Sequence, residues 1–293
     1  MLYLLLFLSV VTAAGKAITG KKVGTDNKTL KGVFRLNCLI YTVALVLVFL
    51  SLYPDFSVLG TLSPFSLIMA VVFSAVMLFT QVTQIMAMAA GSSPVTTLIY
   101  SCGFLIPTVF SAIAFDEAIS PAQLPGIGLI LLSLFLIINP KDAKFSPAWL
   151  IWSLLAMTGS GVSAILQKVH QKSPYAGELS PYLVVVFVLA LLFSAIIYLL
   201  LPKKESDSKP GKISPVPAII SGLCIGFLNI LNLYLAGKIP AVIQFPVYNI
   251  GNLLLTGILG IIFFREKNTV KQLIGFGIGC LGILVIGLFQ QGG

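Results

Sequence analysis

The 293-residue chain contains two copies of one sequence pattern. Three residues near its start return 146 positions later: Gly15, Lys22 and Val23 match Gly161, Lys168 and Val169. Further along the offset is 149: Phe115 and Glu117 match Phe264 and Glu266, and Gly126 and Gly128 match Gly275 and Gly277. One small insertion reconciles the two offsets. A sequence that repeats at a fixed distance predicts two halves with the same succession of elements.

The composition indicates that the halves lie in lipid. Hydrophobic residues make up 58% of the chain and charged residues 9%, and the mean hydropathy is +1.05. A soluble domain would carry roughly a quarter charged residues. The net charge of +9 comes from basic residues in short loops at helix ends, which is typical of membrane anchoring and not of nucleic-acid binding.

Apolar stretches long enough to cross a bilayer as helices recur along the whole chain. Ten are expected, at residues 2–20, 33–53, 64–90, 94–115, 121–139, 147–170, 180–201, 215–236, 241–264 and 270–289. The first also resembles the core of a signal peptide, but it lacks a basic leading segment and matches an internal segment around Ser160–Val169. We therefore interpret it as a membrane helix.

Ten spans divide into two sets of five, residues 1–140 and 141–293. Because five is odd, the second set enters the membrane from the opposite side. The expected fold is an all-α integral membrane protein with two inverted five-helix repeats, an architecture typical of transporters whose site lies between the repeats.

The charge asymmetry of the loops bears on orientation. Most Lys and Arg residues fall in the loops after spans 1, 5, 7 and 9, whereas Lys168, Lys172 and Lys238 fall on the other side. Since basic loops favour the cytoplasm, this pattern places both termini outside.

The segment Ala90–Ser120 resembles the EamA repeat of the drug/metabolite transporter superfamily. It consists of a polar bend, a Ser-containing helix with Pro107 midway, and the sequence Phe-Asp-Glu-Ala-Ile-Ser; the resemblance returns at Gly237–Thr269. It implies two EamA-type units over essentially the whole chain, with ten helices. It also implies transport of small metabolites, and both termini in the cytoplasm, so the orientation stays open.

Polar side chains inside the expected spans identify a candidate site, because they are costly in hydrocarbon unless they pair or line a cavity. Many recur at steps of three or four residues, which places them on one helix face. The expected substrate-binding residues are Thr12, Lys16, Gln81, Gln84, Tyr100, Ser163, Asn229, Asn232, Gln244, Tyr248, Asn249 and Asn252. The alternative for each residue is hydrogen bonding between helices.

Lys16 is the one charge expected well inside a helix, where it either snorkels to the interface or binds a carboxylate or phosphate. All nine acidic residues fall in loops or at helix ends. The carboxylate mechanism of the small multidrug-resistance branch of the superfamily is therefore not expected. Glu117 and Glu266 each precede a helix, where interaction with the helix dipole accounts for them.

The chain lacks the constellations of a membrane enzyme. The four cysteines form no Cys-x-x-Cys pair, and the single histidine, His170, stands at a helix end without a neighbouring acid in the sequence. We expect no catalytic residues, no metal and no cofactor. Pro107 and Pro246 are expected to kink their helices, and the glycines around Gly275–Gly282 to pack closely against a neighbouring helix.

These observations predict a secondary transporter in the cytoplasmic (inner) membrane. It would move a small polar metabolite that is neutral, zwitterionic or anionic, such as an amino acid derivative, by alternating access. The alternatives are a flippase for a lipid-linked headgroup and, less favoured, a membrane-embedded enzyme. The expected partners are the substrate and membrane lipids, with no nucleic acid, and the protein is expected to be a monomer or a homodimer.

Overall fold

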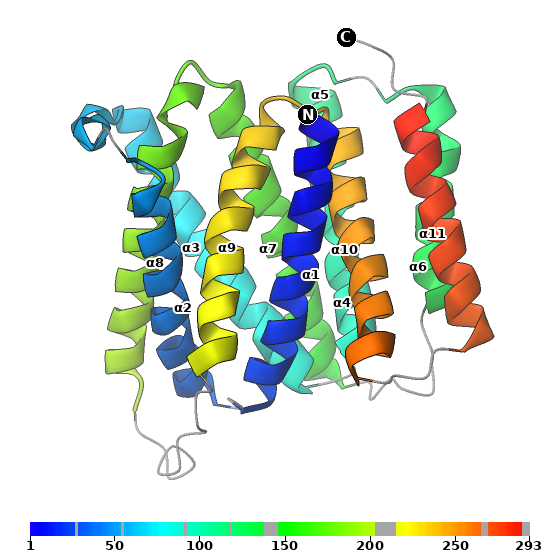
Figure 1. Ribbon diagram of the computed structural model, residues 1–293, viewed down its shortest axis with the longest axis horizontal. Helices are drawn as coiled ribbons and strands as arrows, with labels where there is room; N and C mark the ends of the chain where they lie inside the picture. The colour runs from blue at the N-terminus through cyan, green and yellow to red at the C-terminus, as the bar shows by residue number, and fades with distance from the viewer. Residues whose placement is uncertain are drawn as a thin grey trace.

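The computed structural model describes residues 1–26, 29–53, 56–90, 93–117, 119–137, 146–202, 215–264 and 269–288. In these residues the fold is helical throughout, and the helices stand side by side as one bundle (Figure 1). The first half contains α1 (Leu2–Asp26), α2 (Leu30–Leu50), α3 (Pro64–Ala90), α4 (Ser93–Ser101), α5 (Leu105–Ala114) and α6 (Leu124–Ile137). The second half contains α7 (Pro147–Lys172), α8 (Leu179–Leu200), α9 (Pro215–Ala236), α10 (Ala241–Phe264) and α11 (Val270–Leu288).

Short 3-10 turns connect several of these helices: η1 (Ser57–Thr61), η2 (Cys102–Phe104), η3 (Pro121–Gln123) and η5 (Ala176–Glu178). Within the described residues, seven helices are long and apolar enough to cross a membrane; three shorter apolar segments cover Ile99–Ala114, Pro121–Ile137 and Val270–Ile286. Together they match the ten expected stretches to within a few residues, except that α1 continues to Asp26.

One span is broken where the sequence predicts a kink. The chain changes from α4 to a 3-10 turn at Cys102–Phe104 and then resumes as α5. Pro107 explains the position, because it has no N–H to donate to the carbonyl of Gly103 and its ring crowds that carbonyl. Pro246 by contrast lies inside a continuous α10. The predicted kink at Pro107 therefore coincides with a break in the helix, whereas α10 continues through Pro246 and the kink there stays a prediction.

Helix contacts between the two halves follow the sequence repeat. When spans 1–5 are exchanged with spans 6–10, the pair α3–α7 maps onto α1–α9, and α2–α9 maps onto α3–α8. The pairs α2–α8 and α6–α11 map onto themselves. This is the contact pattern of two repeats related by a two-fold axis. In Figure 1, α1 begins on the upper side of the bundle. Five spans precede α7, and because five is odd, α7 begins on the lower side. The two counterparts α1 and α7 therefore cross the bundle in opposite directions.

The outer surface of the bundle is apolar. Large hydrophobic side chains from many helices face outward, among them Leu4, Val46, Ile68, Ile113, Phe135 and Leu199. A patch of this extent on a soluble protein would cause association, but in a bilayer it contacts lipid chains. Polar side chains are correspondingly directed inward.

The helices α6 and α11 form a pair through glycines. A Cβ atom on Gly126 would lie 2.7 Å from Ile286 Cγ1 and 2.9 Å from the Gly282 carbonyl oxygen, and a Cβ on Gly282 would lie 2.9 Å from the Gly126 oxygen. Ser133 Oγ donates to the Gly275 carbonyl at 2.7 Å across the same interface. The expected close packing is confirmed at Gly275, Gly279 and Gly282, whereas Gly277 faces open space.

Replacing Gly126 or Gly282 with Ala is expected to lower the stability of the protein by about 1–3 kcal/mol, because the new methyl group meets backbone atoms that cannot move aside cheaply. Gly128→Ala and Gly277→Ala are matched controls, since a Cβ there has nothing within 4 Å. Thermal unfolding in detergent measures the difference. Equal melting temperatures for both pairs of variants would contradict the packing.

Candidate functional site

A polar cavity lies inside the bundle, between the two halves of the chain. Its volume is about 110 Å³, which is room for several water molecules or part of a small ligand. The first half contributes side chains from α1, α3, α4, η2 and α5, and the second half from α7, α9 and α10. Movement of one half against the other would therefore reshape the cavity.

Ten of the twelve side chains expected from the sequence line this cavity. They are Lys16, Gln81, Gln84, Tyr100, Ser163, Asn229, Asn232, Gln244, Tyr248 and Asn249. The structure brings them together from six helices that are distant in the sequence. Their role in binding remains a proposal, which the geometry below supports.

Thr12 and Asn252 do not line the cavity. The Thr12 hydroxyl donates to the Leu8 carbonyl of its own helix at 2.8 Å, and Asn252 Oδ1 accepts from the Thr256 hydroxyl at 3.2 Å. Their spacing of four residues from Lys16 and Tyr248 suggested a shared face. A step of four residues also rotates the side chain by about 40°, and here that rotation moves both residues beyond the edge of the cavity.

Amide groups in the cavity wall are partly occupied by each other and by backbone. Gln167 Nε2 donates to Asn229 Oδ1 at 3.3 Å, and Gln244 Nε2 donates to the Asn232 carbonyl at 2.9 Å. Gln244 Oε1 and Ser163 Oγ are buried and have no hydrogen-bond partner among the residues that the structure describes. A buried acceptor without a donor costs free energy. A ligand that donates hydrogen bonds to these two oxygens would remove that cost.

Lys16 gives the cavity its one charged side chain among the described residues. The ion pairs within those residues involve Glu117 and leave Lys16 without a carboxylate partner. A buried cation of this kind favours an anionic group beside it. Tyr100, Tyr248 and Phe104 add aromatic surface.

Sequence reasoning missed the apolar part of the wall. Phe73, Met77, Leu228 and Phe245 line the cavity beside the amides. Nothing in the sequence distinguishes them from the other apolar residues of their helices, since both lipid and cavity accept such side chains. Gln167 also lines the cavity, and its signal was the same as that of the other amides: a polar side chain inside an expected span.

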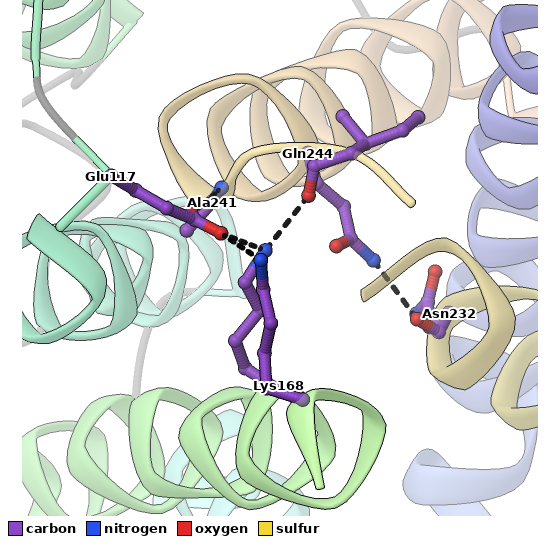
Figure 2. Close-up of polar contacts among 7 residues, drawn as sticks. Glu117, Lys168, Asn232, Ala241 and Gln244 are labelled. Atoms are coloured by element: carbon purple, nitrogen blue, oxygen red, sulfur yellow. Dashed lines mark hydrogen bonds and ion pairs between the residues drawn. The ribbon is translucent and has the colours of Figure 1, made fainter. Parts of the chain in front are cut away.

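A buried ion pair joins Glu117 to Lys168, the neighbour of the cavity residue Gln167, where α7 ends and α10 begins (Figure 2). Lys168 Nζ lies 2.7 Å from Glu117 Oε1 and donates to the Ile239 carbonyl at 2.9 Å. The side chain of Lys168 is 1% exposed, that of Glu117 12%. The sequence predicts Lys168 among the loop charges of one side, whereas in the structure it is a buried residue in the last turns of α7.

Glu117 also stabilises a helix other than the one that follows it. Its Oε2 accepts a hydrogen bond from the backbone N–H of Ala241 at 2.8 Å, at the first residue of α10. The expected helix-dipole interaction therefore involves α10. Glu266, for which the same role was expected, lies outside the described residues.

His170 is a core residue and not an interfacial one. It is fully buried, its Nε2 lies 3.1 Å from Ser66 Oγ, and its ring stacks on Tyr182 at 4.0 Å. An acid lies nearby in space, because Ser66 bonds to Ser63, and Ser63 bonds to Glu178 at 2.9 Å. The helix end that suggested exposure is covered by α3 and α8.

Comparison with known proteins agrees with this architecture. Residues 147–288 match the model of the EamA-like transporter family. A crystal structure of another protein is similar to the chain with a TM-score of 0.76 and 15% sequence identity, covering 100% of this chain and 99% of that one. At that identity the likeness shows the fold alone. No curated protein matches the chain in sequence.

The family match covers the second half, and the structural match covers both halves. Residues 147–288 therefore form a domain of the EamA-like transporter family, and the chain is a multi-pass membrane protein.

Proposed function

We propose that this protein is a secondary transporter that moves a small polar metabolite across the cytoplasmic membrane by alternating access. The two repeats are residues 1–140 and 141–293, and the substrate binds in the cavity between them. One observation carries the proposal: thirteen polar side chains from both halves line one internal cavity. Polar residues are concentrated at a substrate pathway because elsewhere in the membrane they are costly.

The ends of the cavity differ in chemistry. Lys16 lies about 21 Å along α1 from its upper end, whereas Gln244 lies about 5 Å along α10 from the same side. The lower end thus offers a cation, and the upper end offers the free acceptor Gln244 Oε1. An anionic group of the substrate would bind at Lys16, and N–H donors elsewhere on the substrate would bind the amide oxygens of the wall. An amino acid derivative with a carboxylate and further N–H donors offers both.

A thermal-shift screen of the purified protein against polar metabolites identifies the ligand. A compound at 100 times its Kd is expected to stabilise the folded state by about 2.7 kcal/mol. Zwitterionic and anionic metabolites should give the shifts, and hydrophobic cations should not. Shifts from lipid-like headgroup compounds alone would contradict the proposal and support a flippase.

Lys16→Gln is expected to raise the Kd of an anionic or zwitterionic hit about tenfold or more, because a charge-assisted hydrogen bond is lost. A neutral hit should change little. Lys31→Gln is the matched control: Lys31 donates to the Leu201 carbonyl and lies over the Tyr198 ring, away from the cavity. Equal losses for Lys16→Gln and Lys31→Gln would show that Lys16 does not bind the ligand.

Two amide residues of α10 allow a comparison between a residue of the cavity wall and a nearby residue outside it. Gln244→Ala is expected to weaken binding about fivefold or more, since it removes a free acceptor. Asn252→Ala should leave binding unchanged, because Asn252 lies outside the cavity wall. Isothermal titration of both variants with the same ligand makes the comparison, and a reversed order would place the site elsewhere on α10.

A further inference from the structure

The upper side of the cavity is covered by side chains and backbone that exclude water. Lys168 and Ala241 are 1% and 0% exposed, and Ile239 is 4% exposed. Lys168 directly follows the cavity residue Gln167, and Ala241 stands one turn before the cavity residue Gln244. A passage from the cavity to the upper side between the end of α7 and the start of α10 would therefore displace these residues.

Glu117 connects the parts of this layer. Its carboxylate receives three donors: Lys168 Nζ at 2.7 Å, Lys172 Nζ at 3.3 Å and the Ala241 N–H at 2.8 Å. Glu117 follows α5 in the first half, whereas all three donors belong to the second half. The contact thus joins the two repeats at one side of the membrane.

The backbone before Glu117 is held in a sparsely populated conformation. Asp116 has φ of 52° and is the non-glycine residue with positive φ in the described part of the chain. Aspartate tolerates this left-handed region better than most residues do. Such a conformation persists when the surrounding structure stabilises it, and here the bonds of Glu117 supply that stabilisation.

We propose that the Glu117–Lys168 pair is the latch that keeps the upper side closed, and that it positions the repeats for transport. This inference rests on the proposed function. Rocking of one repeat against the other would separate Glu117 from all three donors at once. In the open state the separated charges would regain water, so the ion pair can break and re-form during a cycle.

Cysteine accessibility tests the latch without a known substrate. Ser163→Cys is a nearly isosteric reporter that faces the cavity, introduced after replacement of Cys38, Cys102, Cys224 and Cys280 by Ala. The protein is reconstituted in vesicles, and a membrane-impermeant maleimide is added to one face at a time. A tag on the N-terminus, which lies on the upper side, identifies that face.

Glu117→Gln is expected to raise the rate of labelling from the upper face about tenfold or more, with no rise from the lower face, because it biases one equilibrium toward the open state. Lys168→Gln should have the same effect, and the double variant should add little, since both changes break one contact. Glu117→Asp keeps the charge but shortens the side chain, and gives an intermediate rate. It provides the test if Glu117→Gln does not fold.

Two matched controls separate the latch from general loss of charge. Lys172→Gln removes a lysine that touches the same carboxylate but is 39% exposed, and exposed pairs contribute little. Glu178→Gln removes another upper carboxylate, which bonds to Ser63 and pairs with no lysine of the described residues. Both should change the rate less than about twofold.

Three results would contradict one or the other of the two proposals. An unchanged upper-face rate in folded Glu117→Gln overturns the latch, as does an equal rise from both faces, which indicates general loosening. If Ser163→Cys reacts from neither face in any variant, the cavity is not on a transport route, and the proposed function fails instead.

Discussion

The arrangement of this protein depends on one constraint: a polar group in hydrocarbon must find a partner. The hydroxyl groups of the spans meet it locally. Thr83 and Ser194, for example, each donate to a carbonyl four residues earlier in the same helix. Long amide side chains cannot all be satisfied in this way. Seven of them line one internal cavity, where they bond partly to one another and to backbone and leave some acceptors free.

The sequence repeat also contains the residue types of the ion pair. By the repeat offsets, Lys22 corresponds to Lys168 and Glu266 corresponds to Glu117, so each half carries one lysine and one glutamate at matching positions. In the described residues the glutamate of the first half meets the lysine of the second. The side chain of Lys22 and the residue Glu266 lie outside the part of the chain that the structure describes.

The sequence predicted the fold well because the signals for a membrane fold are long and redundant. Apolar runs of about 20 residues define spans, and the duplication relates the halves to each other. Much of the site was also predictable, since Gln, Asn and Lys inside apolar runs are conspicuous. Phe73 and Leu228 could not be found, because cavity and lipid accept the same apolar side chains. Thr12 and Asn252 lie outside the cavity wall, because a spacing of four residues fixes a helix face only to within tens of degrees, and their role in binding stays a prediction.

The sequence predicted least well how deeply a basic side chain near a helix end is buried. Lys168 and His170 stand within five residues of the end of α7, yet both are buried, because Glu117 and the α3–α8 pair cover that end. Their partners are far away in sequence, and no local pattern specifies them.

The two buried lysines show how a charge can be tolerated in different ways. Lys168 is neutralised by Glu117 and by the Ile239 carbonyl, so its charge is satisfied in the absence of any ligand. Lys16 has no carboxylate partner in the described residues and faces a cavity with room for one. An unpaired cation in low-dielectric surroundings is stabilised by water or by an anion. A ligand that brings a carboxylate to Lys16 would therefore replace water by a charge. One lysine thus joins the two halves through Glu117, and we propose that the other binds an anionic group of the substrate.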